Sequence, residues 1–285
     1  MKVNILTPRN PDFPTKLLNI AKPPKQLYAI GEWPLLSPLV AIVGARKATP
    51  YGTEVARRLA TDLAGYGVTV VSGLALGVDA AAHRGALTSG RTVAVVPGSI
   101  QEVQPASHRG LAREILRNRG SIISEYPDNE RIRPQSFIER NRLISGLSDA
   151  VVVIEAAQRS GSLSTAQFAL EQGKPVLAVP GNITSPLSQG TNRLLATGAR
   201  PALTVEDILE EIGFQPARAV QPPRADTKEQ SQLLKLIGAG QSNPDLLSAR
   251  SGLAPAALTH ELTTLELNGH IKNIPGIGWV LTKIG

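Results

Sequence analysis

The 285-residue chain contains no cysteine, a single methionine and only 4% aromatic residues. Without cysteine it has neither disulfides nor thiolate metal sites, which fits a cytoplasmic protein. The four histidines are never spaced as HxH or HxxxH, so we expect no metal site. No segment approaches the ~18 apolar residues of a membrane span, and the opening MKVNILTPRNPDF is too polar for a signal peptide. These absences favour a cytoplasmic protein that does not contact a membrane.

Two glycine-rich nucleotide motifs are also missing. The chain contains neither GxxxxGK(S/T), the loop of many NTP-hydrolysing proteins, nor GxGxxG, the usual dinucleotide fingerprint. We therefore expect no nucleotide cofactor.

Positive charge, by contrast, is plentiful. The formal net charge is +7, and residues 109–142 hold eight arginines, no lysine and five acidic residues. Clustered basic charge is the electrostatic footprint of a nucleic-acid-binding protein.

Residues 39–212 alternate short β-branched runs with helical patterns, and 42% of the chain is apolar, enough for a sizeable core. Runs without polar alternation are typical of strands buried on both faces of a parallel sheet. We predict an extended Rossmann-like, doubly wound α/β domain that binds ligands at the carboxyl ends of its strands. The predicted strands are Val40–Val43, Thr69–Ser72, Thr92–Val96, Ser121–Ser124, Ala150–Glu155, Val176–Val179 and Ala202–Val205. The predicted helices include Gly52–Gly65, Asp79–Ser89, Leu111–Asn118 and Thr165–Gln172.

Three segments flank or follow this domain. Residues 1–38 are rich in proline and predict a short helix and an edge strand packed on the core. Residues 213–227 lack apolar periodicity and predict a linker. Residues 228–285 predict three helices, the last capped by Gly269, and a hairpin with a Pro-Gly turn, which together indicate a small winged-helix domain.

Two glycine loops follow predicted strands, Gly44–Thr49 (GARKAT) and Ser72–Asp79 (SGLALGVD). Such loops present backbone N–H groups and the positive end of a helix to an anion. Arg46 adds a cationic fork that matches a phosphate, and Gly73 lets the backbone turn tightly beneath a ligand. Alternatively, Thr49 is only a helix N-cap and Arg46 a surface residue.

Asp79 and His83 lie four residues apart on one predicted helix face, a spacing that a catalytic pair can use. No serine or cysteine nucleophile is obviously placed beside them. We therefore expect a helix-capping Asp79 and a packed His83, and no catalytic residue.

The stretch Ser136–Ser148 (SFIERNRLISGLS) brings Arg140, Asn141 and Arg142 close to Phe137 in the sequence. Arginine near an aromatic ring suits a single strand, because charge follows the backbone while the ring stacks a base. A solvated arginine turn with Phe137 in the core is the structural alternative.

A third loop, Arg159–Thr165 (RSGSLST), opens another predicted helix and offers Ser160, Gly161 and Ser162 to an anion. The segment Pro180–Asn192 adds side-chain donors. Four such loops at one sheet edge can contact several phosphates at once. They therefore suit a nucleic-acid strand better than a mononucleotide.

The sequence closely resembles the DprA/Smf family of DNA-processing proteins over about residues 5–212. The motifs that carry the resemblance are VGARKAT, SGLALGVDAAAHRGAL, SEYP, FIERNRLISGLS, SGSLST, VPGN and SQGTNRLLATGA. The resemblance implies a non-enzymatic protein without a cofactor that binds single-stranded DNA and protects incoming strands during natural transformation. It also implies that the protein loads the RecA recombinase and forms a homodimer through the Rossmann-like domain.

By position, the resemblance implies that the Arg46 loop grips a phosphate and that Phe137 lines a DNA groove. Two positions depart from the family pattern: Gln104-Pro105 replaces Tyr-Pro, and Pro134 replaces a lysine, whose charge Arg131 or Arg133 could supply. The expected DNA-binding residues are Gly44, Arg46, Thr49, Gly73, Arg109, Arg133, Phe137, Arg140, Asn141, Arg142, Ser160, Gly161 and Ser162.

Two other functions compete with this one. The lysine-decarboxylase-like (LOG) phosphoribohydrolases share this Rossmann variant, but Phe168 stands where their loop carries a glutamate, so acid–base chemistry lacks its agent. A winged-helix transcription factor would read DNA through residues 254–268, which contain Glu261 and Glu266 but no lysine or arginine. Acidic side chains facing phosphates are repulsive, and we expect this tail to contact protein or to be auxiliary.

Overall fold

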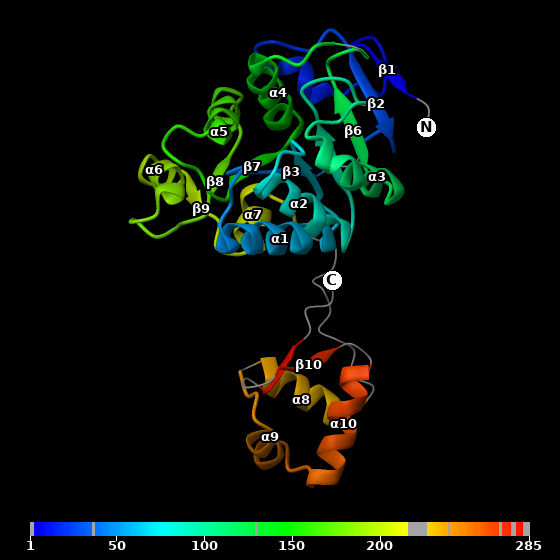
Figure 1. The fold of residues 1–285 in the computed structure, drawn as a ribbon. Coiled ribbons are helices and arrows are strands. Elements are labelled where there is room, and N and C mark those ends of the chain that lie inside the picture. The colour runs from blue at the N-terminus through cyan, green and yellow to red at the C-terminus, as the bar shows by residue number, and fades with distance from the viewer. Residues whose placement is uncertain are drawn as a thin grey trace. The chain divides into compact units, whose positions relative to one another are not determined.

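The computed structural model describes residues 3–35, 38–128, 130–215, 227–238, 240–267, 270–274 and 278–281. The chain divides into two compact units, Met1–Gln215 and Pro216–Gly285 (Figure 1). The division falls within the expected linker 213–227, of which residues 216–226 lie outside the described residues.

The first unit is built on one sheet in the order β1-β2-β6-β5-β4-β3-β7-β8-β9. Strands β3 to β9 form parallel pairs with their neighbours, and β2 joins β6 in antiparallel orientation. Every residue of β3 to β8 is buried, as the uninterrupted apolar runs predict. The doubly wound α/β fold is confirmed. The strands are β1 (Asn4–Leu6), β2 (Leu27–Gly31), β3 (Leu39–Val43), β4 (Thr69–Ser72), β5 (Thr92–Val95), β6 (Ser121–Ser124), β7 (Ala150–Val153), β8 (Val176–Ala178) and β9 (Arg200–Pro201).

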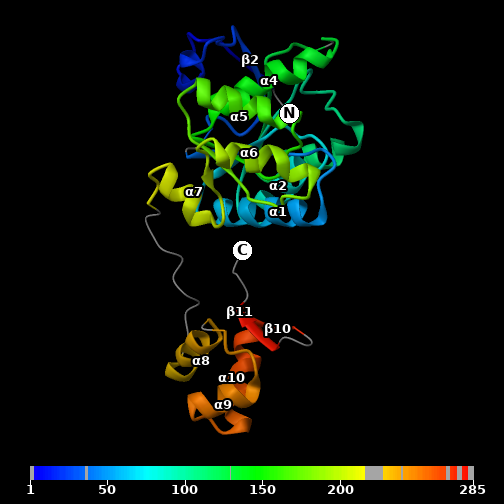
Figure 2. The same cartoon turned by 90° about the vertical axis from the view of Figure 1, so that its left-hand side faces the viewer.

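Helices cover both faces of this sheet. Helices α4 (Pro134–Leu147) and α5 (Gly161–Glu171) pack on one face, where Leu143 and Ala166 meet Val43 and Val153. The opposite face carries four helices, and Figure 2 shows α1 and α2 on the far side of the sheet from α4 and α5. These four helices are α1 (Pro50–Gly65), α2 (Val78–Leu87), α3 (Arg109–Arg117) and α7 (Val205–Glu211), and α6 (Gln189–Ala196) follows β8.

The N-terminal segment contributes more than the expected edge strand. It supplies two strands, of which β1 forms the edge and β2 lies between β1 and β6. Between them the 3₁₀ turn Thr15–Asn19 buries Leu17 against Gly146 of α4. Extending the sheet in this way lets the short segment bury its apolar side chains.

The predicted strand Ala202–Val205 is wrong. The strand at this edge is β9, and Val205 already begins α7. The Asp207 carboxylate accepts hydrogen bonds from the backbone N–H groups of Leu203 and Thr204, both at 2.8 Å. This capping arrangement stabilises the first turn of α7, although the apolar run at residues 202–205 by itself favours a strand.

The crossover direction reverses between β3 and β7, which are neighbours in the sheet. From β3 the chain passes through α1 to β4 on one side, and from β7 it passes through α5 to β8 on the other. Loops diverge at such a switch point and leave a crevice outside the carboxyl ends of the strands. The sequence predicts ligand binding at this edge.

The second unit is the expected winged-helix pattern, and its core gathers Leu233, Leu247, Leu262 and Ile271. Its predicted Gly269 cap and Pro-Gly turn lie outside the described residues. None of the helices in the described part of the chain is long and apolar enough to span a membrane. The elements of this unit are α8 (Lys228–Gly238), α9 (Pro244–Ser251), α10 (Pro255–Leu267), β10 (Ile271–Ile274) and β11 (Gly278–Leu281).

Candidate nucleic-acid interface

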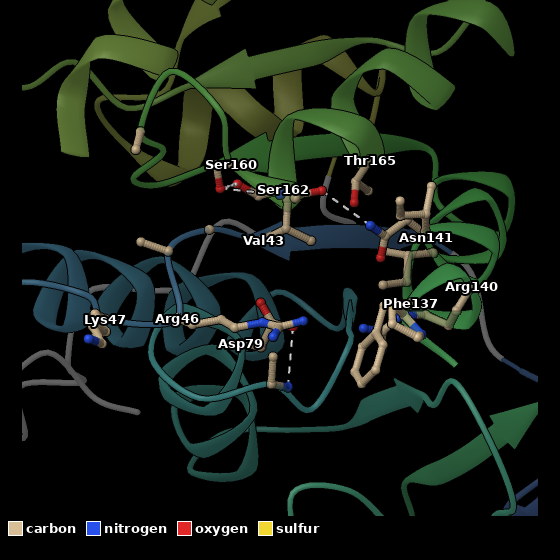
Figure 3. A pocket seen from close by; sticks show the side chains of 18 of the residues that line it. Val43, Arg46, Lys47, Asp79, Phe137, Arg140, Asn141, Ser160, Ser162 and Thr165 are labelled. Carbon is tan, nitrogen blue, oxygen red and sulfur yellow. Dashed lines mark hydrogen bonds between the residues drawn. The ribbon is translucent and has the colours of Figure 1, made fainter. Parts of the chain in front are cut away.

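A pocket of about 820 Å³ occupies the crevice at the switch point (Figure 3). The loop after β3, the first half of α4 and the loop that opens α5 supply most of its lining. Nine of the thirteen predicted residues line it. These nine are Gly44, Arg46, Arg133, Phe137, Arg140, Asn141, Ser160, Gly161 and Ser162.

Arg46 and Phe137 meet in this pocket. The Arg46 guanidinium carbon lies 5.0 Å from the centre of the Phe137 ring, and Figure 3 shows the arginine extending toward it. Arg46, Lys47 and Arg133 are exposed, and no ion pair in the described part of the chain uses them. The pocket thus combines available cations with a half-buried aromatic ring.

Of the two arginines that could replace the lysine expected at Pro134, Arg133 is the one at the pocket. Arg133 is among the residues that line the pocket, whereas Arg131 is not. Arg133 stands at the N-cap of α4, with its backbone N–H donating to the Ser136 hydroxyl at 3.2 Å. Arg133 therefore brings to the pocket a positive charge like that of the lysine that the family pattern has at position 134.

The start of α5 forms one wall of the pocket. The Ser160 hydroxyl caps the helix by accepting from the Ser162 N–H at 3.3 Å. Asn141 of α4 donates to the Gly161 carbonyl at 3.2 Å and to the Ser164 hydroxyl at 2.9 Å. These two bonds hold α5 against α4 and use both N–H groups of the Asn141 amide, which leaves its carbonyl oxygen for a ligand.

Arg140 lines the pocket but is only 4% exposed. Its Nη1 donates to the Gly73 carbonyl at 2.6 Å and also to the Val95 carbonyl, at the ends of β4 and β5. Burial lowers the pKa of Arg140 to about 10, while the charge of Asp79 raises it. The predicted DNA-groove arginine thus ties α4 to the sheet, a structural role that the sequence did not predict.

Asp79 completes this buried arrangement. Its carboxylate accepts from the N–H groups of Gly73 at 3.1 Å and Ala75 at 3.4 Å, which belong to the loop before α2. The N-cap of α2 is Gly77, and no side chain caps this helix, so the expectation that Asp79 caps it is wrong. Burial raises the pKa of Asp79, against the lowering effect of Arg140 and the two amides. His83 is fully buried with Nδ1 2.7 Å from the Thr92 hydroxyl, so it is packed, as expected.

Thr49 does not line this pocket. Its hydroxyl donates to Glu155 at 2.5 Å and accepts from the Gly52 N–H at 3.0 Å, and its own N–H donates to Glu155 at 2.9 Å. A Cβ at Gly52 would collide with the Glu155 carboxylate, which is why this position is glycine. The protein's own carboxylate thus occupies the N-terminus of α1, so the structure offers no support for the predicted contact between Thr49 and a phosphate.

Three other predicted residues also lie outside the pocket. Gly73 is buried, and the Arg140 guanidinium fills the space that a side chain there would need. Arg142 points to Glu125, whose two oxygens its Nη2 contacts at 2.7 and 2.5 Å. Arg109 is exposed at the start of α3 and is not a lining residue.

The loop Pro180–Asn192 contributes only Leu187 to the pocket. Its polar groups are used internally: Asn192 exchanges two hydrogen bonds with the backbone of Gly181, and Asn182 accepts from Thr184. Three glycine loops therefore meet at the pocket instead of the four expected.

The sequence did not single out Lys47, Ile132, Thr165 or Glu155. Lys47 follows Arg46 in the GARKAT loop and lines the pocket, so the loop sequence was sufficient to predict it as a second cation of the site. Glu155 meets Thr49 only in three dimensions, across 106 positions of the chain. Among the described residues, no group of three or more His, Cys, Asp or Glu side chains could hold a metal ion.

Comparison with known proteins places the chain in a family. The model described as DNA recombination-mediator protein A matches residues 4–213, and that of the DprA winged helix domain matches residues 215–276. Protein Smf of Escherichia coli is 36% identical over 285 residues, which cover 95% of this chain and 76% of Smf. The putative DNA processing protein DprA of Mycobacterium tuberculosis is 40% identical over 237 residues, which cover 80% of this chain and 61% of that protein.

Two solved structures share the fold. DNA processing protein A of Streptococcus pneumoniae has a TM-score of 0.70 at 33% identity, covering 75% of this chain and 76% of its own. DNA processing protein A of Helicobacter pylori, described for its single-stranded DNA binding mode, has a TM-score of 0.67 at 35% identity, covering 74% and 95%. Together with the two matched models, these relatives show that the chain belongs to the DNA recombination-mediator protein A (DprA) family of DNA-processing proteins.

Proposed function

We propose that this protein binds single-stranded DNA in the pocket at the switch point, without regard to sequence. The observation that carries the proposal is the contact between exposed Arg46 and the half-buried ring of Phe137. Single strands are held by cations that follow the phosphates and by rings on which bases stack. The described binding mode of the Helicobacter relative supports the same ligand.

The arrangement favours a single strand over a duplex. A base can reach the Phe137 ring only if it is unpaired and turned outward, since duplex bases are stacked inside the helix. Phosphate contacts from Arg46, Lys47 and Arg133 carry no base information, so binding tolerates any sequence.

The proposal includes no catalysis. Among the described residues that line the pocket, Asp79 is the only acidic one, and its carboxylate is buried and held by two backbone amides. A phosphoribohydrolase needs a carboxylate that reaches its substrate. Phe168 instead occupies the position at which the LOG-type loop carries its glutamate.

The wider role rests on the family. We propose that the protein protects incoming strands during natural transformation, loads the RecA recombinase onto them in the cytoplasm, and acts as a homodimer through its first unit. Membership of a recombination-mediator family supports this role. Strand exchange by RecA with and without the protein, together with its mass in solution, tests both parts.

Titration of labelled single- and double-stranded oligonucleotides tests the central proposal. We expect tighter binding of the single strand, and a loss in Arg46→Ala that is equal for all sequences. Arg9→Ala removes an exposed cation outside the pocket and is the matched control. Equal affinity for both forms of DNA, or equal behaviour of the two variants, would overturn the proposal.

A further inference from the structure

Helix α3 carries a row of arginines outside the pocket. Arg109, Arg113 and Arg117 are all exposed and follow one another at intervals of four residues. Residues four apart lie on one face of a helix, about 6 Å apart along its axis. The opposite face buries Leu111, Ala112 and Ile115 against the sheet, so the row faces solvent.

These arginines have no structural partner among the residues that the structure describes. No ion pair or side-chain hydrogen bond in the described part of the chain uses any of them. Arg119, just beyond the helix, differs because it is paired with Glu32 at 3.0 Å. Glu114 is the one acidic side chain of α3 and is exposed as well, which leaves the helix with an excess of positive charge.

The row begins next to the pocket. His108, directly before Arg109, donates from Nδ1 to the Leu74 carbonyl at 2.8 Å, and the next residue, Ala75, lines the pocket. Helix α3 follows β5, which is two strands away from β3 in the sheet. Through His108, the start of the row is thus joined to the loop that supplies Ala75 to the pocket.

We propose that the arginine row of α3 is a second contact for single-stranded DNA, over which a strand leaving the pocket continues. This inference rests on the proposed function. Continuity with the pocket and the absence of paired acids favour a phosphate backbone over an acidic protein surface. No aromatic residue lies in α3, so this contact holds phosphates only and adds length to the bound segment without adding base preference.

The test compares two lengths of labelled oligothymidine, about 6 and about 30 nucleotides, the shorter lying inside the range of a single binding fold. The variant replaces Arg109, Arg113 and Arg117 by glutamine. The matched control replaces three exposed cations of the N-terminal segment, Arg9, Lys22 and Lys25, by glutamine and removes the same charge. Thermal unfolding of each protein checks that all of them are folded.

We expect the α3 variant to bind the short oligonucleotide as the wild type does and the long one at least tenfold more weakly. Each lost phosphate contact to a single strand lowers the slope of log affinity against log salt by about 0.7. The slope for the long oligonucleotide should therefore fall by about 2, and the control should change neither slope nor affinity.

Equal loss for both lengths, or the same loss in the control, would overturn the inference, because the arginines would then act through general charge. So would an α3 variant that binds the long oligonucleotide as the wild type does, which would assign the row to another partner. A wild-type protein that binds neither length would overturn the proposed function and this inference with it.

Discussion

The Arg46 guanidinium carbon stands 5.0 Å from the centre of the Phe137 ring, although 91 positions separate the two residues in the chain. Arg46 comes from the loop after β3, and Phe137 from the first turn of α4. A cation over a ring contributes about 0.5–1 kcal/mol at an exposed site. The contact holds a cation and an aromatic surface together in the protein without a ligand.

Replacement of Phe137 tests whether the ring stacks a base. Phe137→Ala should weaken single-strand binding by about 1–3 kcal/mol, the usual cost of losing one stacked base. Phe137→Leu keeps apolar volume without a flat π-face and should lose nearly as much. Fluorescence anisotropy measures both variants. Unchanged affinity in both would mean that Phe137 only packs.

Replacement of Arg140 separates support from DNA contact. Arg140→Met removes the bonds to the Gly73 and Val95 carbonyls and the positive charge that favours the ionised form of buried Asp79. Each buried acceptor left without a donor should cost about 1–3 kcal/mol of unfolding free energy. The double variant with Asp79→Asn should recover part of this loss. Urea unfolding measures the stability.

The salt dependence of DNA binding by the Arg140→Met variant distinguishes a supporting role of Arg140 from a direct contact with a phosphate. If the residue only supports the pocket, the folded variant keeps the wild-type salt slope. A variant as stable as the wild type, whose slope falls by about 0.7, would mean that Arg140 contacts a phosphate directly.

Thr49→Ala should destabilise the protein without affecting DNA binding. It removes a helix cap, which costs about 0.5–2 kcal/mol, but Glu155 already occupies this helix end. Ser160→Ala is the matched comparison, since Ser160 caps α5 inside the pocket and should lose both stability and affinity. If Thr49→Ala lost affinity while keeping its stability, the first helix end would bind DNA after all.

His83 predicts a specific dependence of stability on pH. Burial lowers its pKa from 6.5 to about 3 in the folded protein. Between these values the unfolded chain binds a proton that the folded chain does not, so the free energy of unfolding falls as the pH is lowered through this range. One such group contributes about 1.4 kcal/mol per pH unit and has no effect above its unfolded pKa.

Urea unfolding between about pH 7 and pH 4.5 measures the effect of His83. His83→Gln keeps a polar group beside Thr92 but does not titrate. The difference in unfolding free energy between wild type and variant should therefore shrink or reverse as the pH falls. Parallel pH curves for the two proteins would show that His83 does not control this slope.

Local patterns were enough to predict the framework of the pocket. Uninterrupted apolar runs identified the buried strands, and parallel strands bring their carboxyl ends, with the loops of Gly44 and Ser160, to one edge. That geometry brings Arg46 to the crevice, whereas the position of Phe137 was implied only by the family resemblance. The edge strand β9 was misplaced because an apolar run at residues 202–205 also suits the first turn of a capped helix.

The roles of individual polar residues could not be predicted in the same way. Arg140, Asn141 and Arg142 are adjacent in sequence, but a helix turns them about 100° apart. One therefore ties α4 to the sheet, one holds α5, and one binds Glu125. Such assignments depend on partners that are distant in the chain, as Glu155 is from Thr49.

Amide hydrogen exchange with and without a single-stranded oligonucleotide tests the location of the binding site most directly. Our account predicts slower exchange, on addition of the oligonucleotide, in the pocket-forming segments 44–47, 133–141 and 160–165. Protection confined to residues 227–281, with exchange in those three segments unchanged, would contradict it.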